Sequence, residues 1–312
     1  MTQLTYPRAR KGDVVDDYFG TKVPDPYRWM EDLDSPEVAA WREAQNALTF
    51  SYLDRLPLRD RLRTRITALW DYPKTGMPAR EGGRYFYARN SGLQRQAPIY
   101  VRASLDAAPD VVIDPNLLSP DGSVSLAQWA PSPDGRLLAY GLAEGGTDWQ
   151  TIHVRDLATG RDLDDAVEWM RFSSLSWTKD DRGFFYSRYP EPPKGQALEA
   201  ALSGHAVYYH VVGTPQADDV LVYERPDHPT WFIGGGVTED GRYLLVTTAR
   251  GSDNTNRLYA ADLGDPFHPN VHAPIRAIVE RDDAEFAPIG NHGSTVFVRS
   301  DLDAPNRKIF AI

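Results

Sequence analysis

The stretch Asp134-Gly135-Arg136-Leu137-Leu138-Ala139-Tyr140 contains the pattern that decides the fold. The acidic residue and the glycine favour a tight turn, and the branched and aromatic residues that follow favour a β-strand. The same pattern returns four times along the chain. Its other copies are Glu81-Gly82-Gly83-Arg84-Tyr85-Phe86-Tyr87, Asp181-Arg182-Gly183-Phe184-Phe185-Tyr186, Asp240-Gly241-Arg242-Tyr243-Leu244-Leu245-Val246 and the fainter Asn291-His292-Gly293-Ser294-Thr295-Val296-Phe297-Val298.

The spacing of these turns indicates a repeat architecture. Their last glycines lie 52, 48, 58 and 52 residues apart, and each unit continues into a second strand, such as Thr151-Ile152-His153-Val154-Arg155. Units of about 50 residues with short antiparallel strands are typical of β-propeller blades. A β-sandwich of regular hairpins is the alternative that periodicity alone leaves open.

The length of the repeating part predicts about five blades. Residues 73–312 comprise 240 residues, and the last predicted strand is 308–312, so we expect an incomplete propeller domain whose chain ends inside a blade. An open propeller exposes strand edges and apolar blade faces to water. The sequence therefore predicts either a five-bladed ring with an unusual closure or a piece of a longer protein.

A different pattern precedes the repeats. Ser35-Pro36-Glu37 combines a capping residue, a proline at the first helical position and an acid in the first turn, which predicts the start of a helix that extends to about Leu53. A second amphipathic helix is expected before Pro73, because apolar residues recur on one face. These apolar residues are Leu58, Leu62, Ile66 and Leu69. Residues 1–72 are thus predicted to form an N-terminal arm and two helices.

The composition excludes several classes of function. The net charge of −10, from 34 Lys+Arg and 44 Asp+Glu, opposes binding of nucleic acid. The absence of cysteine removes disulfides, thiolate metal sites and a thiol nucleophile. No apolar stretch reaches the roughly 18 residues of a membrane span, and the first residues lack the apolar core of a signal peptide. We expect no membrane partner and a cytoplasmic location, or a periplasmic one if a leader was removed.

The sequence shows no complete catalytic apparatus. No serine has the Gly-x-Ser-x-Gly surroundings of a nucleophile elbow, so we expect no catalytic residue in this chain. His268 and His272 have the spacing of zinc ligands on a helix, but three nearby prolines exclude that helix. We therefore expect no metal and no cofactor.

Several segments carry a resemblance to a known family. Val14-Val15-Asp16-Asp17-Tyr18-Phe19-Gly20 and the run from Val23-Pro24-Asp25-Pro26-Tyr27-Arg28-Trp29 to Ser35 closely resemble the N-terminal segment of the prolyl oligopeptidase family. The resemblance continues in order over nearly the whole chain. Further matching stretches are Asp71-Tyr72-Pro73-Lys74, Asn90-Ser91-Gly92-Leu93-Gln94, Thr147-Asp148-Trp149, Tyr208-Tyr209-His210-Val211-Val212-Gly213-Thr214, Asn256-Arg257-Leu258-Tyr259 and Pro305-Asn306-Arg307.

The resemblance implies a serine endopeptidase that cleaves short peptides after proline. In this family an α/β-hydrolase domain, completed by the N-terminal segment that matches residues 1–72, is lidded by a seven-bladed propeller that gates substrate access. About five of the seven blades are present here, and the catalytic Ser, Asp and His follow the point where this chain ends. The implied partners are proline-containing short peptides and the missing hydrolase domain, and the chain alone is predicted to be inactive. The alternative is a stand-alone, non-catalytic propeller that acts as a binding module.

The resemblance also implies three substrate-binding positions. They match Phe172, Phe232 and Ser252. Two aromatic faces would give an apolar wall for a peptide side chain. The alternative is that Phe172 and Phe232 belong to the core of the blades.

Overall fold

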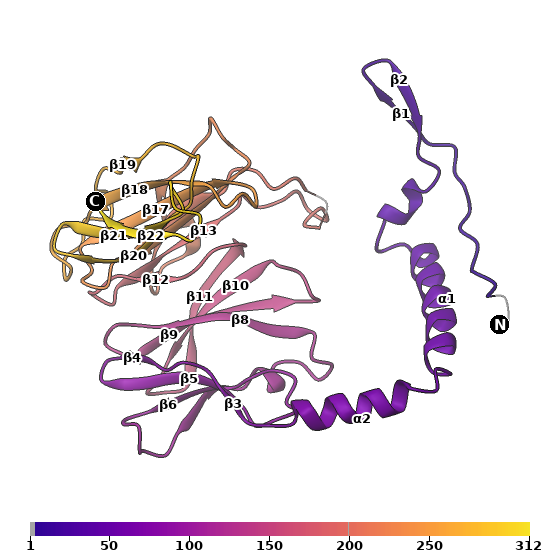
Figure 1. Cartoon of the computed structure of the whole chain (residues 1–312), viewed down its shortest axis with the longest axis horizontal. Coiled ribbons are helices and arrows are strands. Elements are labelled where there is room, and N and C mark those ends of the chain that lie inside the picture. Colours follow the sequence, from indigo (N-terminus) through magenta and orange to yellow (C-terminus); the bar gives the residue numbers. More distant parts are fainter. Residues whose placement is uncertain (1–3, 199) are drawn as a thin grey trace. The chain divides into compact units, whose positions relative to one another are not determined.

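The computed structural model describes residues 4–198 and 200–312, and it divides into two compact units, Met1–Tyr72 and Pro73–Ile312. The first unit contains a hairpin, a short 3-10 helix and two α-helices (Figure 1). Their bounds are β1 (Val15–Tyr18), β2 (Thr21–Pro24), η1 (Arg28–Glu31), α1 (Pro36–Leu53) and α2 (Arg59–Trp70). None of the helices among the described residues is long and apolar enough to cross a membrane.

Helix α1 begins and ends where its sequence predicts. The Ser35 hydroxyl accepts a hydrogen bond from the Glu37 amide at 3.3 Å, and Pro36 occupies the first turn, so the cap satisfies one of the amides that have no partner within the helix. Val38 is the one buried residue of α1, and α2 has none. The apolar stripe of α2 is therefore largely exposed.

The second unit consists of antiparallel blades, one for each sequence repeat (Figure 1). Blade 1 contains β3 (Lys74–Thr75), β4 (Ala79–Glu81), β5 (Arg84–Asn90), β6 (Ile99–Arg102) and β7 (Asp110–Ile113), and blade 2 contains β8 (Val124–Pro131), β9 (Leu137–Glu144), β10 (Gln150–Asp156) and β11 (Arg161–Met170). Blade 3 contains β12 (Ser176–Trp177), β13 (Gly183–Arg188), β14 (Ala206–Val211) and β15 (Val220–Tyr223), and blade 4 contains β16 (Trp231–Val237), β17 (Tyr243–Arg250), β18 (Asn256–Asp262) and β19 (Arg276–Val279). Blade 5 contains β20 (Phe286–His292), β21 (Thr295–Ser300) and β22 (Lys308–Ala311).

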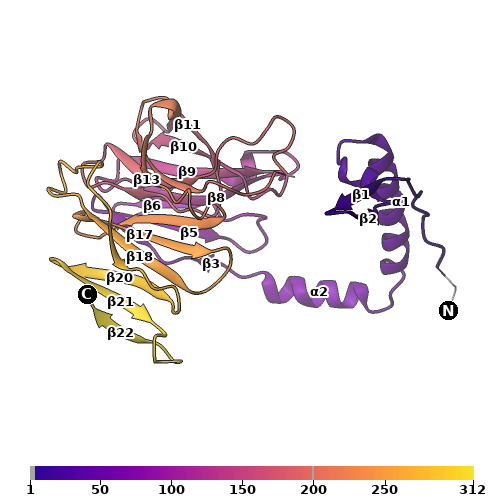
Figure 2. The ribbon, with the colours of Figure 1, turned by 90° about the horizontal axis from the view of Figure 1, so that it is seen from above.

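The blades confirm the predicted fold class, a mainly β propeller preceded by helices. Blades 2 and 3 are continuous through one residue pair, Met170 with Arg188, which is why they form one eight-stranded sheet. Blade 5 has three strands in this chain, and β22 pairs with β21 (Figure 2). Two short 3-10 helices, η2 (Pro115–Leu117) and η3 (Gln216–Asp218), lie in the connections.

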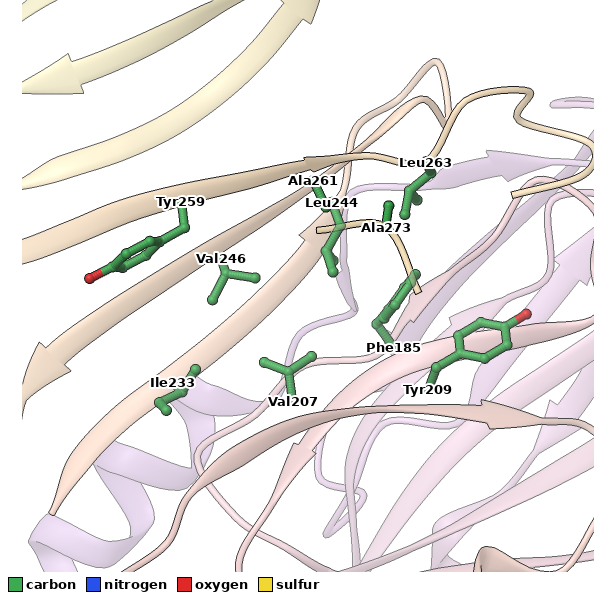
Figure 3. Close-up of a cluster of buried hydrophobic side chains, with 10 residues drawn as sticks. All are labelled: Phe185, Val207, Tyr209, Ile233, Leu244, Val246, Tyr259, Ala261, Leu263 and Ala273. Atoms are coloured by element: carbon green, nitrogen blue, oxygen red, sulfur yellow. The ribbon is translucent and has the colours of Figure 1, made fainter. Parts of the chain in front are cut away.

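The core of this unit lies between successive blades rather than within any one blade. Alternate residues of each strand point to opposite faces of its sheet, and the buried ones meet those of the next blade. Figure 3 shows this contact between blades 3 and 4. The clusters include Ile113 with Leu138 and Tyr140, Ile152 and Val154 with Phe184, Phe185 and Val207 with Leu244 and Val246, and Leu258 with Phe286 and Val298.

The turn that joins the first two long strands of a blade has a recurring internal structure. In blade 4 the Thr238 hydroxyl bonds the Asp240 carboxylate at 2.6 Å, and Gly241 has φ +80°. Blade 2 repeats this with Ser132, Asp134 and Gly135. In blade 3 the residue with positive φ is Asp181, at +60°, whereas Gly183, which the sequence spacing treated as the turn glycine, lies at the start of β13.

Candidate functional site

Two of the three predicted site residues lie together. Phe172 belongs to the loop between β11 and β12, and Phe232 is the second residue of β16, yet their ring centroids are 5.1 Å apart with a tilt of 38°. Phe172 is 49% exposed and Phe232 is half-buried. Neither ring is fully buried, so this aromatic pair presents apolar surface at the junction of three blades.

The third predicted residue is separate from the rings. Ser252 lies in the exposed turn between β17 and β18. Phe232 pairs with Ala249 near the end of β17, so Ser252 occupies the same end of blade 4 as Phe232. The structure thus brings Phe172 and Phe232 into contact and places Ser252 at the neighbouring end of the blade.

Arg171 holds Phe172 from the side of blade 2. Its guanidinium lies 4.9 Å from the Phe172 ring centroid and 5.2 Å from that of Trp149, which are favourable cation–π distances. The same guanidinium donates to the Asp148 carboxylate at 2.7 Å. Phe172 itself has a φ of +52°, a conformation that is costly for a bulky residue and that needs such surrounding contacts to persist.

His205 supports Phe232 from the side of blade 3. Its Nδ1 accepts a hydrogen bond from the backbone amide of Ile233 at 3.0 Å. Its ring contacts the Phe232 ring edge-on, with ring centroids 6.2 Å apart. The Tyr189 ring stacks on the same imidazole, with ring centroids 4.4 Å apart. Burial lowers the pKa of His205 to about 4, so the imidazole is neutral at neutral pH and adds no charge to the aromatic wall.

A hollow of about 310 Å³ adjoins the Phe172 ring. Its other walls include the first strand of blade 2, through Ser125 and Ala127, and the polar side chains of Asp148 and Gln150. Ligand sites in proteins commonly combine an apolar wall with a few hydrogen-bonding groups. The hollow offers binding groups, and its lining contains no histidine that could activate a serine as a nucleophile.

The sequence reasoning missed the residues that hold this wall. Arg171 is adjacent to Phe172 in the sequence, so its position was a usable signal, but its partner Asp148 is 23 residues away. His205 carried no signal, because the amide that it binds belongs to another blade, 28 residues further on.

A second group of titratable side chains joins blades 2 and 3. His210 is fully buried, and its two ring nitrogens contact Asp219 at 2.7 Å and Asp165 at 2.9 Å. Burial alone would lower the pKa of His210, but the hydrogen bonds and charges of the two carboxylates outweigh it and raise the pKa to about 9. The bonds that Asp165 accepts from His210 and from the Gly213 amide lower its pKa despite burial. Because all three side chains are fully buried, this cluster connects the two blades through their interior.

Comparisons with known proteins agree with this architecture. A family model described as the prolyl oligopeptidase N-terminal beta-propeller domain matches residues 6–312. A prolyl endopeptidase of Elizabethkingia meningoseptica is 36% identical over 308 residues, which cover 98% of this chain and 42% of that protein. Prolyl oligopeptidase A of Amanita bisporigera is 37% identical over 342 residues, and the match covers 100% of this chain and 44% of that protein.

Solved structures show the same relation. The structure of prolyl oligopeptidase B from Galerina marginata, bound to a 35mer hydrolysis and macrocyclization substrate, matches with a TM-score of 0.83 and 33% identity over 99% of this chain and 45% of that one. The chain therefore spans less than half the length of the relatives it matches. Because the family model covers almost every residue, the resemblance seen in the sequence is confirmed. This chain belongs to the prolyl oligopeptidase family and corresponds to its N-terminal β-propeller part.

Proposed function

We propose that this chain is the N-terminal and propeller portion of a serine endopeptidase that cleaves short peptides after proline, and that the propeller gates access of the substrate. The match over residues 6–312 carries this proposal, and relatives that bear the name prolyl endopeptidase support it. The location that we propose is the cytoplasm, with the periplasm as the alternative.

Residues 1–72 have a separate role in this proposal, which is to complete an α/β-hydrolase domain. The apolar side chains of α2 support it, because Leu62, Ile66 and Leu69 are 56–60% exposed. An amphipathic helix whose apolar stripe is exposed over about two turns gains stability when another surface covers it.

Phe172, Phe232 and Ser252 are proposed to face the bound peptide. The two rings supply an apolar wall, and the neutral His205 and the paired Arg171 keep that wall in place. Ser252, at the same end of blade 4, adds a small polar group beside it.

Kinetics of the enzyme assembled from this chain and its hydrolase domain test the wall. Phe172→Ala and Phe232→Ala should each raise KM for a fluorogenic prolyl peptide by about tenfold, because each removes buried contact area from the substrate. Phe267→Ala is the matched control, since that ring is also exposed but lies in the connection between β18 and β19. An unchanged KM in both wall variants would contradict the assignment.

The chain alone tests where the nucleophile lies. We expect no hydrolysis of a fluorogenic prolyl peptide by the purified 312-residue protein. Turnover that a serine-directed inhibitor abolishes would show that the nucleophile is within these residues.

A further inference from the structure

One face of blade 2 carries a second hollow, of about 370 Å³. It lies over β9, β10 and β11, and the residues that matter to its chemistry are Glu144, Trp149, Thr151, His153, Glu168 and Trp169. Phe172 and the other residues of the aromatic wall do not line it. It adjoins the hollow beside Phe172, because Thr147 and Gln150 line both, and the remaining lining residues differ.

The pairing of the strands explains why these side chains share one face. Gln150 of β10 pairs with Met170 and Ile152 pairs with Val167, so two residues of β11, Glu168 and Trp169, lie opposite the single residue Thr151. This is a β-bulge, which can turn successive side chains toward the same surface. Trp169, the second residue of the bulge, has a positive φ of +61°.

Blade 3 holds this bulge in place. The side-chain amide of Gln216, in η3, accepts from the Glu168 amide at 3.0 Å and donates to the Glu168 carbonyl at 3.1 Å. The Tyr189 amide donates to the Trp169 carbonyl at 3.1 Å. Both bulge residues are thus fixed through their backbones, and their side chains remain available to the hollow.

Two tryptophans form perpendicular walls. The Trp149 and Trp169 ring centroids are 5.8 Å apart, with an interplanar angle of 83°, and the Trp149 indole is anchored because it donates to the Ala197 carbonyl at 2.7 Å. Arg171 already lies 5.2 Å from the Trp149 ring and is bound to Asp148. The electron-rich face of Trp149 therefore attracts a cation in this structure, as indole faces do in general.

The two glutamates are the acidic residues of the lining, and the nearby Arg171 guanidinium is paired with Asp148. Glu144 and Glu168 are exposed, and neither carboxylate forms an ion pair with another described residue. His153 is the other titratable side chain of the lining, and no lysine or arginine lines it. Two carboxylates and two indoles together match an organic cation.

We propose that this hollow binds the cationic side chain of a lysine or arginine in a peptide. The ammonium or guanidinium group would lie against an indole face within reach of the Glu144 and Glu168 carboxylates, and the aliphatic part of the side chain would pack on Trp169. The choice of a peptide as the carrier rests on the proposed function, whereas recognition of the cation rests on the residues alone.

NMR titration of the 312-residue chain tests this binding without any measurement of peptide cleavage. The probes are acetyl-Gly-Lys-Gly-amide and the same peptide with norleucine in place of lysine, which keeps the aliphatic chain and removes the charge. The lysine peptide should shift the indole N–H signals of Trp149 and Trp169, assigned from Trp→Phe variants, and should bind at least about fivefold more tightly than the norleucine peptide.

Glu→Gln substitutions test which carboxylates attract the cation. The double variant Glu144→Gln and Glu168→Gln should weaken lysine binding to the level of norleucine, whereas Glu280→Gln, an exposed glutamate between blades 4 and 5, should leave it unchanged. Equal affinity for the two peptides, or no shift at 20 mM lysine peptide, would overturn the proposal. The two proposals can fail separately. If the enzyme assembled with the hydrolase domain does not cleave prolyl peptides but the chain still binds the lysine peptide, the proposed function is contradicted and the cation site stands.

Discussion

His210 connects two blades through a charge that the protein interior would ordinarily disfavour. It bonds Asp165 of β11 and Asp219 just before β15, and the Tyr186 hydroxyl donates to Asp219 at 2.5 Å. Because the imidazole has a raised pKa, of about 9, it is protonated at neutral pH and compensates the negative charge of the carboxylates. A neutral residue in its place would leave buried carboxylates without compensation.

His210→Gln should therefore lower the free energy of unfolding by about 3–5 kcal/mol at pH 7. Urea unfolding followed by tryptophan fluorescence measures the loss. His272→Gln is the control, because His272 is exposed and lies in a loop. A loss below about 1 kcal/mol for His210→Gln would show that the buried charges do not depend on the imidazolium.

The same residue predicts a pH dependence with a definite sign. The pKa of His210 is about 9 in the folded protein and about 6.5 in an unfolded chain, so the folded state binds the extra proton between these values. The stabilisation is complete below about pH 6.5 and is lost as the pH rises through 9. The difference in unfolding free energy between the natural protein and His210→Gln should thus shrink from pH 6.5 to pH 9.5. A constant difference over this range would contradict the assignment.

At the element scale, the turn of blade 1 offers two neighbouring glycines with different surroundings. Gly82 and Gly83 both have positive φ, of +54° and +76°. A Cβ on Gly82 would lie 1.9 Å from the backbone oxygen of Asp134 in blade 2, whereas a Cβ on Gly83 would meet nothing within 4 Å. The first glycine therefore serves the contact between blades, and the second serves only the turn.

Gly83→Ala should cost about 1–2 kcal/mol, the price of a left-handed conformation for a residue with a Cβ. Gly82→Ala should cost more than about 3 kcal/mol, because overpacking against the blade 2 backbone adds to the same conformational cost. Thermal unfolding of the two variants compares them directly. Equal melting temperatures would show that a Cβ on Gly82 adds no cost from its contact with the blade 2 backbone.

The parts of the fold that the sequence predicted are those set by local patterns. Helix α1 follows from its cap and stripe, and the strands after each turn follow from a few adjacent residues. The bulge at Trp169 and the contact of Phe172 with Phe232 depend on pairings between distant segments, which periodicity does not encode. In blade 3 an aspartate, Asp181, takes the conformation that glycine takes in blades 2 and 4, so a search for glycine alone misplaces that turn.

The candidate site was predicted only through the resemblance. Composition and spacing pointed to no binding residue, because a phenylalanine in a strand ordinarily belongs to the core. The structure adds what the resemblance lacked, namely the exposure of Phe172 and the supports from Arg171 and His205.

At the scale of the whole molecule, two kinds of surface are exposed, namely apolar side chains of α2 and the outer edge of blade 5. The apolar stripe of α2 includes Leu62 and Ile66, which are 56% and 60% exposed. Strand β22 lies at the edge of blade 5, where it pairs with β21, and it carries the exposed Ile309. Exposed apolar stripes and free strand edges both favour association with another surface.

The purified 312-residue chain should therefore self-associate and bind a hydrophobic dye strongly. Leu62→Glu together with Ile66→Glu should reduce both effects, because charged side chains would then interrupt the stripe of α2, whereas Arg61→Glu together with Arg65→Glu should not, because it changes charge in the same helix without removing apolar surface. Light scattering and dye fluorescence measure the two effects, and circular dichroism checks that the helix persists. A monodisperse monomer that melts cooperatively and binds little dye would mean that these surfaces are satisfied within the chain, which would count against the proposal that residues 1–72 complete a hydrolase domain.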